Sequence, residues 1–179
     1  THISSPEYKK YITQQRDVEA KESDYKWSAG DTIRTAIGQS YNNYTSALMS
    51  KYVATLANGG TRYSMHFLNK ITTNDGKIEE EYQPKVESKI EIKKENLDAI
   101  FRGMFLVTTG PRGTLSSYFK DFPVNVAAKS GTAQQSSKRS EHTTFVAFAP
   151  LEDPQISVCV IIPFGNGTTG PAPKVAKAA

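Results

Sequence analysis

Ala127-Ala128-Lys129-Ser130-Gly131-Thr132-Ala133-Gln134 is the stretch of this sequence that decides the fold. It starts apolar and then places a lysine, two hydroxyls and a glycine in succession. Because a strand alternates its faces, Lys129 and Gly131 project to one side and Ser130 and Thr132 to the other. Gly131 lets a ligand approach the backbone, and an ammonium and hydroxyls beside unpaired N–H groups suit a carboxylate-bearing peptide that adds itself as a strand.

The residues around this stretch read as further strands. Apolar and β-branched runs separated by turn residues predict three adjacent antiparallel strands, at residues 124–134, 143–149 and 156–163. Beyond them, Pro171 and Pro173 lead into an Ala- and Lys-rich segment that is predicted to form a helix over one face of the sheet. Lys-Ser-Gly-Thr alone also occurs on solvated loops, so its interpretation depends on this context.

Upstream, two helices and a hairpin are predicted. One helix begins after Thr45 as N-cap, repeats apolar residues at the helical period and ends at Asn58-Gly59-Gly60. A second begins at about Glu95 and stops near Gly110-Pro111. Between the helices, extended runs at residues 63–71 and 78–82 flank Asn74-Asp75-Gly76-Lys77, which is a hairpin signal.

The domain prediction divides the chain into two unequal parts. Residues 1–30 are polar and charged and are interpreted as a connecting segment, whereas residues 31–179 carry the helices, the hairpin and the motif-bearing sheet. The expected fold class is α/β of the α+β type, an antiparallel sheet flanked by helices, with the Lys129 strand at the edge that borders a cleft. Both chain ends read as interrupted, so we expect residues 1–179 to be one portion of a larger domain.

Composition excludes several function classes. The net charge of +4 over 179 residues is spread over a surface of mixed sign, which does not favour a nucleic-acid partner. His2, His66 and His142 match no metal-ligand spacing, so no metal site is predicted. Cys159 is the only cysteine and lies in an apolar run, where a small buried hydrophobic side chain is expected. No stretch is long and apolar enough to predict membrane contact by this segment.

The Lys129-Ser130-Gly131-Thr132 motif resembles the third motif, Lys-Thr/Ser-Gly, of penicillin-binding transpeptidases and serine β-lactamases. Residues 30–39 and 52–60 also resemble the helix region of class B, monofunctional, penicillin-binding proteins. The two matches occur in the family's order, and the Gly113-Thr114 loop and the closing strand pair also suit that family. The resemblance covers nearly everything from Gly30 onward and implies the C-terminal portion of a transpeptidase domain.

The family's other two motifs, Ser-x-x-Lys and Ser-x-Asn, are not convincingly present. Ser23 and Ser117 fit the first pattern literally and Ser40 fits the second. Ser23 lies in a charged segment too close to Ser40, Ser117 follows the helix that precedes the third motif, and Ser40 occupies a turn into the next helix. We therefore expect no nucleophile in this chain.

The resemblance implies acyl transfer in the intact domain. A serine outside this chain would attack a D-Ala-D-Ala stem peptide of peptidoglycan, release D-alanine and pass the acyl group to an amine. β-Lactams would acylate the same serine. Lys129 and Thr132 are the implied catalytic residues, and the implied substrate-binding residues are Ser130, Gly131, Thr132, Ala133 and Gln134. Lys138 and Arg139, in the loop 136–142, are read as a solvated turn rather than as substrate contacts.

The resemblance also implies partners and a location. The partners would be stem peptides, β-lactams and the N-terminal part of the transpeptidase domain, and no cofactor is implied. The intact protein is expected at the extracytoplasmic face of the bacterial membrane, anchored by a segment outside these residues. A β-lactam-sensing receptor domain and a noncatalytic peptide-binding module remain alternatives.

Overall fold

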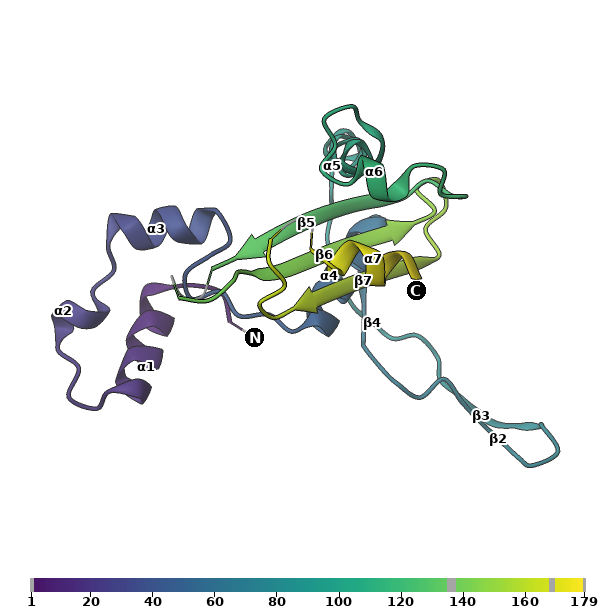
Figure 1. Ribbon diagram of the computed structural model, residues 1–179. Coiled ribbons are helices and arrows are strands. Elements are labelled where there is room, and N and C mark those ends of the chain that lie inside the picture. The colour runs from purple at the N-terminus through teal and green to yellow at the C-terminus, as the bar shows by residue number, and fades with distance from the viewer. Residues whose placement is uncertain (1, 135–137, 168–169, 179) are drawn as a thin grey trace.

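The centre of the computed structural model is a three-stranded antiparallel sheet with helices on both faces (Figure 1). The structure describes residues 2–134, 138–167 and 170–178. The sheet consists of β5 (Ala127–Ala133), β6 (His142–Ala149) and β7 (Ile156–Ile162) in the order β5-β6-β7. The three predicted strands and their antiparallel pairing are confirmed, and β5 lies at the edge of this sheet. The α+β fold class is therefore confirmed.

Strand register assigns each face of the sheet to a different set of helices. Ala128 pairs with Ala147 and Ser130 with Phe145, and this face packs against Leu115, Phe119 and Ala172. The other face carries Ala127 paired with Phe148, which packs against Val53, Phe101 and Met104. The two faces therefore form two separate clusters of buried residues, and the sheet lies between them.

Four helices supply these two layers. α4 (Ser46–Ala57) and α5 (Lys94–Thr109) cover the face of Phe148, and α6 (Ser116–Phe119) and α7 (Ala172–Ala178) cover the face of Phe145. Figure 1 shows α4 and α7 on opposite sides of the sheet. The Thr45 N-cap is confirmed, since its hydroxyl accepts from the Leu48 N–H, and Gly59 and Gly60 end α4 with positive φ angles of 80° and 106°.

The prediction of a connecting segment over residues 1–30 is wrong in its local structure. This region forms α1 (Pro6–Arg16), α2 (Glu22–Tyr25) and the beginning of α3 (Ala29–Ala36). Both α1 and α3 begin at a serine N-cap, since the Ser5 hydroxyl accepts from the Tyr8 N–H and the Ser28 hydroxyl from the Asp31 N–H. A buried ion pair also joins the two helices: Lys9 Nζ lies 2.9 Å from Asp31 Oδ2, and both residues are at least 90% buried. Few apolar residues mark these helices, so hydrophobic periodicity did not reveal them.

The predicted hairpin is confirmed in part. β2 (Lys70–Thr72) pairs with β3 (Ile78–Glu81) across the expected turn, and Figure 1 shows this hairpin projecting away from the sheet. The predicted first run at 63–71 is not one strand, because its beginning belongs to β1 (Thr61–Tyr63), which pairs with β4 (Val86–Lys89). The segment between α4 and α5 therefore consists of two short strand pairs, β1 with β4 and β2 with β3.

Candidate functional site

A groove of about 840 Å³ follows the end of β5 on the face of the sheet that carries Lys129. Its walls come from the segment after α3, the start of α4, the end of α5 with the loop that follows, and the strands. The predicted strand and the Gly113-Thr114 loop therefore meet at one site. The lining residues are Ile37, Gly38, Asn42, Asn43, Tyr44, Met49, Val107, Arg112, Gly113, Thr114, Lys129, Ser130, Gly131, Thr132, Ala133, Thr144 and Ile161.

Lys129 and Gly131 lie on the same face of β5, as strand alternation predicts. Lys129 is exposed, and its ammonium donates a hydrogen bond of 2.6 Å to the Ser130 carbonyl oxygen. A Cβ added at Gly131 would only make ordinary contacts, the nearest with Thr144 Cβ at 3.6 Å. The fold itself therefore leaves room for a side chain at this position, and the glycine keeps the strand surface open.

Ser130 and Thr132 share the opposite face but differ in environment. Ser130 is only 5% exposed, because it pairs with Phe145 inside the hydrophobic cluster. Thr132 lies two residues further toward the end of β5 and is exposed. Ala133 also lines the groove, whereas Gln134 is exposed and is not one of the lining residues. Of the two hydroxyls, only that of Thr132 lies where a solvent-borne ligand reaches it.

The segment 37–44 contributes groove residues that sequence reasoning did not single out. The Asn42 side chain is already engaged, because its Oδ1 accepts from the Ser4 N–H at 3.0 Å and its amide donates to Gln39 O at 2.9 Å. Asn43 forms an isolated bridge with His2. The resemblance of residues 30–39 to the family's helix region was the available signal that this segment lies near the motif strand.

The three serines set aside on sequence grounds do not line the groove. Ser23 is exposed in α2, where its hydroxyl donates to Asp24. Ser40 is exposed and has a φ of 71° in the turn before Asn42. Ser117 lies in α6 and lines a different cavity. None of these three serines is among the residues that line the groove.

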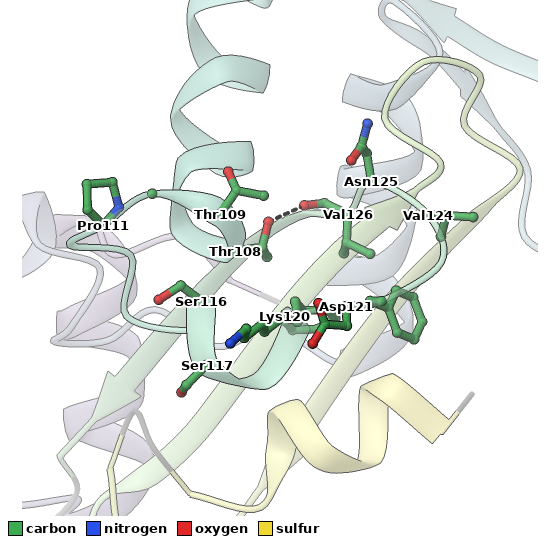
Figure 2. Close-up of a pocket in the computed structure, with 13 residues that line it drawn as sticks. Thr108, Thr109, Pro111, Ser116, Ser117, Lys120, Asp121, Val124, Asn125 and Val126 are labelled. Carbon is green, nitrogen blue, oxygen red and sulfur yellow. Dashed lines mark hydrogen bonds between the residues drawn. The ribbon is translucent and has the colours of Figure 1, made fainter.

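The cavity that includes Ser117 has a volume of about 520 Å³ and lies between the end of α5, α6 and the loop that leads into β5 (Figure 2). Lys120 of the literal Ser-x-x-Lys match also lines it. At its wall the Thr108 hydroxyl donates a hydrogen bond of 2.6 Å to the Val126 carbonyl. This cavity shares no lining residue with the groove of Lys129, so the match lies outside the candidate site.

The remaining predicted residues lie away from the groove. Cys159 is half-buried, and burial raises the pKa of its thiol, as expected for a structural cysteine. Arg139 lies over the Phe164 ring at 5.2 Å; residues 136 and 137 of the same loop fall outside the described residues. Within residues 2–134, 138–167 and 170–178, no cluster of His, Cys, Asp and Glu has the arrangement of a metal site. No helix of this described part combines the length and apolar character of a membrane span.

Lys-Ser-Gly-Thr is similar to the Lys-Thr-Gly motif of penicillin-binding proteins and serine β-lactamases, and here it lies on an edge strand beside a groove. Residues 9–179 match the family model described as the penicillin binding protein transpeptidase domain. The chain belongs to this family.

Known proteins and structures agree with this membership. The chain is 35% identical over 160 residues to the peptidoglycan D,D-transpeptidase MrdA of Escherichia coli strain K12, covering 82% of this chain and 25% of that protein. It is 30% identical to penicillin-binding protein 2B of Streptococcus pneumoniae, covering 85% of this chain and 24% of that protein. The chain thus spans about a quarter of the length of these relatives.

The fold also superposes on solved structures. Pseudomonas aeruginosa PBP2 in complex with WCK 5153 matches with a TM-score of 0.70 and 30% identity, over 97% of this chain and 34% of that one. Penicillin-binding protein 2B of Streptococcus pneumoniae strain R6 matches with a TM-score of 0.72 and 28% identity, over 86% and 26%. Both similarities cover most of this chain.

Proposed function

We propose that this chain is the C-terminal part of a peptidoglycan D,D-transpeptidase that binds β-lactams. The observation that carries the proposal is the exposed Lys129 on an edge strand, beside a groove, in a chain of the transpeptidase family. The relative named peptidoglycan D,D-transpeptidase MrdA supports the same activity. Since peptidoglycan lies outside the cytoplasmic membrane, the intact protein would act on the extracytoplasmic face.

The proposed reaction is acyl transfer through a serine supplied by the part of the domain N-terminal to this chain. The serine attacks the carbonyl of the penultimate D-alanine, the terminal D-alanine leaves with a proton, and the acyl group passes to an amine on a neighbouring peptide. A β-lactam acylates the same serine by opening its ring. Exposed apolar residues of α3 and of the segment after it support a contact with that N-terminal part: Ile33 is 65% exposed, and Ile37, which lines the groove, is 68% exposed.

Lys129 and Thr132 are the proposed catalytic residues. The Lys129 ammonium would supply positive potential and proton transfer near the leaving group. The Thr132 N–H would be one of two oxyanion-hole donors, each worth roughly 3–4 kcal/mol in acyl transfer. Residues two apart along a strand direct their backbone groups to the same edge. The hydrogen bond from Lys129 to Ser130 O therefore supports an outward-facing Thr132 N–H.

The proposed substrate-binding residues are Ser130, Gly131, Thr132, Ala133 and Gln134. The peptide would lie along the free edge of β5, with its terminal carboxylate on the exposed Thr132 hydroxyl. The open space at Gly131 supports a close approach of the peptide backbone. Burial of Ser130 favours a backbone role for that residue over a hydroxyl contact.

The test is intact-mass spectrometry after incubation with a penicillin. The samples are this chain alone and the protein extended upstream through its own Ser-x-x-Lys segment. One added penicilloyl mass on the extended protein alone, lost in Lys129→Ala and kept in Lys120→Ala, is the expected result. Lys120 is a matched control because it is exposed and lines the other cavity. Acylation of this chain alone would overturn the assignment of the nucleophile to the N-terminal part.

A further inference from the structure

Thr143 is a buried threonine whose hydroxyl has no part in the reaction proposed above. The residue is 0% exposed, and its hydroxyl donates a hydrogen bond of 2.8 Å to the carbonyl oxygen of Gly167. Gly167 ends residues 163–167, the segment directly after β7, which we call the post-β7 loop. The hydrogen bond therefore ties this loop to the beginning of β6, where Thr143 is the second residue.

Thr143 lies directly beside Thr132 on the neighbouring strand. The two residues are partners in the register of β5 and β6, so their side chains project from the same face of the sheet. Figure 1 shows β5 and β7 ending on the same side of the sheet, as the strand order requires. By holding the loop on its own side chain, Thr143 places the loop next to the Thr132 hydroxyl.

Glycines allow the backbone after β7 to come this close to Thr143. A Cβ at Gly165 would lie 2.8 Å from Thr143 Oγ1, and a Cβ at Gly170 would lie 3.0 Å from the same atom. Gly167 has a φ of 86°, in the left-handed region that favours glycine. Because glycine has more backbone freedom than any other residue, the loop depends on contacts such as the Thr143 bond for a single conformation.

Two further hydrogen bonds connect the loop to the start of β6, and both are longer. The Phe164 N–H donates to His142 Nδ1 at 3.2 Å, at an exposed position. The Asn166 N–H donates to Glu141 O at 3.3 Å. Thr143 therefore supplies the shortest of the three bonds, from a side chain that water does not reach.

We propose that Thr143 is a positioning residue for the acyl-transfer reaction. It holds the post-β7 loop as a wall of the subsite at Thr132 that receives the terminal carboxylate of a peptide or a penicillin. Such a wall limits where the carboxylate, and with it the reacting carbonyl, can lie, and a misplacement of about 1 Å can cost about 100-fold in rate. This inference rests on the proposed function, since it assumes that a carboxylate binds at Thr132.

The first experiment measures acylation of the intact protein by a fluorescent penicillin in stopped flow. Thr143→Val keeps the shape of the side chain and removes the donor. We expect the acylation rate constant at saturating penicillin to fall roughly five- to twentyfold, with a smaller change in the concentration that gives half saturation. Thr143→Ser retains the hydroxyl and should stay within about threefold of the wild type. An unchanged rate constant in Thr143→Val would overturn the inference.

Thr108→Val is the matched control for a general loss of stability. Thr108 is 2% exposed, and its hydroxyl also donates to a backbone carbonyl remote in sequence, that of Val126 at 2.6 Å. Val126 precedes β5, whereas Thr132 lies near the end of that strand. Acylation should therefore change less than about twofold in Thr108→Val. Equal slowing in Thr108→Val and Thr143→Val would show a general effect of stability and overturn the role of Thr143.

The second experiment needs no covalent step, so it separates this inference from the proposed function. Hydrogen–deuterium exchange of the post-β7 loop is compared with and without an N-acetylated peptide ending in D-Ala-D-Ala, which carries either a free C-terminal carboxylate or an amide. We expect the free carboxylate form alone to slow exchange about threefold or more, and Thr143→Val to lose this protection.

The outcomes of the exchange experiment are distinct. Protection by neither peptide, equal protection by both, or protection that survives in Thr143→Val would overturn the inference. If protection follows the expected pattern but penicillin does not bind covalently to the intact protein, Thr143 still holds the wall of a carboxylate subsite. In that case the transpeptidase proposal fails, and the noncatalytic peptide-binding alternative takes its place.

Discussion

Lys9 Nζ lies 2.9 Å from Asp31 Oδ2 inside the N-terminal helical region, and Asp31 is 1% exposed. The Asp31 carboxylate also accepts hydrogen bonds from the Ser28 N–H and hydroxyl at 2.8 and 2.7 Å. Lys9 Nζ donates in addition to the Lys26 carbonyl at 2.8 Å. The Lys9–Asp31 ion pair and the hydrogen bond from Lys9 to the Lys26 carbonyl therefore join α1, the end of α2 and α3.

Replacing Asp31 by asparagine should destabilise the protein by roughly 3 kcal/mol, because the buried Lys9 ammonium loses its counterion. The free energy of unfolding in urea, followed by circular dichroism, measures the change. Arg34→Gln is the matched control: Arg34 pairs with the same carboxylate at 3.2 Å, but its side chain is 60% exposed. Its loss should cost at most about 0.5 kcal/mol. A cost for Arg34→Gln equal to that for Asp31→Asn would contradict the importance of burial.

The same pair predicts a pH dependence. The Lys9 ammonium, followed by the Ser28 hydroxyl and N–H, holds the pKa of Asp31 well below its ordinary value. Because the pKa is depressed in the folded state, the stabilisation is complete above the unfolded pKa of about 4 and is lost as pH falls below it. Urea unfolding between pH 7 and 3 should show a steeper loss of stability for the wild type than for Asp31→Asn. Parallel curves would show that other carboxyl groups control acid unfolding.

The hydrogen bond from the Thr108 hydroxyl to the Val126 carbonyl, at 2.6 Å, connects α5 to the start of β5. Thr108→Val keeps the shape of the side chain but removes the donor, so we expect a loss of roughly 1–3 kcal/mol. Thr109→Val is the control, because Thr109 is exposed and bonds only within its own helix. Thermal unfolding measures both variants, and a similar shift in the two would argue against a specific role for the α5–β5 bond.

Gly60 is constrained by its φ of 106° and by the backbone of the segment before α5. A Cβ would lie 2.2 Å from Ile90 O, and the Gly60 carbonyl accepts from the Ile90 N–H at 2.9 Å. Gly60→Ala should therefore cost roughly 3 kcal/mol through strain and overpacking. Gly76→Ala has a comparable φ of 84° but open space around its Cβ, and should cost about 1 kcal/mol. Chemical denaturation compares the two, and equal costs would mean that the contact with Ile90 O relaxes.

The difference in burial between Ser130 and Thr132 predicts different effects on acylation in the intact protein. Thr132→Ala should slow acylation by penicillin about tenfold or more, because it removes a hydrogen bond to the ligand carboxylate. Ser130→Ala should change the rate by less than about threefold, since the Ser130 hydroxyl faces the Phe145 cluster. Stopped-flow measurement with a fluorescent penicillin tests this order, and a larger effect of Ser130→Ala would reverse the proposed roles.

Local sequence signals predicted the elements that have strong periodicity or clear caps. The strands around Lys129, the helix capped by Thr45 and the helix that stops at Gly110 all fall within a few residues of their predicted bounds. Alternation along β5 also predicted which of its side chains share a face. These features depend on residues close together in the chain, so the sequence alone contains their physical cause.

Only the tertiary structure decided the features that depend on residues far apart. The buried Lys9–Asp31 ion pair holds α1 against α3, and no local pattern indicates that these two charged residues are buried together. The groove brings Arg112 together with Lys129 through a turn after α5 and a strand that is remote from it in sequence. Charge balance at a site is a property of the side chains that line it in space. The sequence determined the motif strand, and the packing of the helices around it determined what else a ligand meets there.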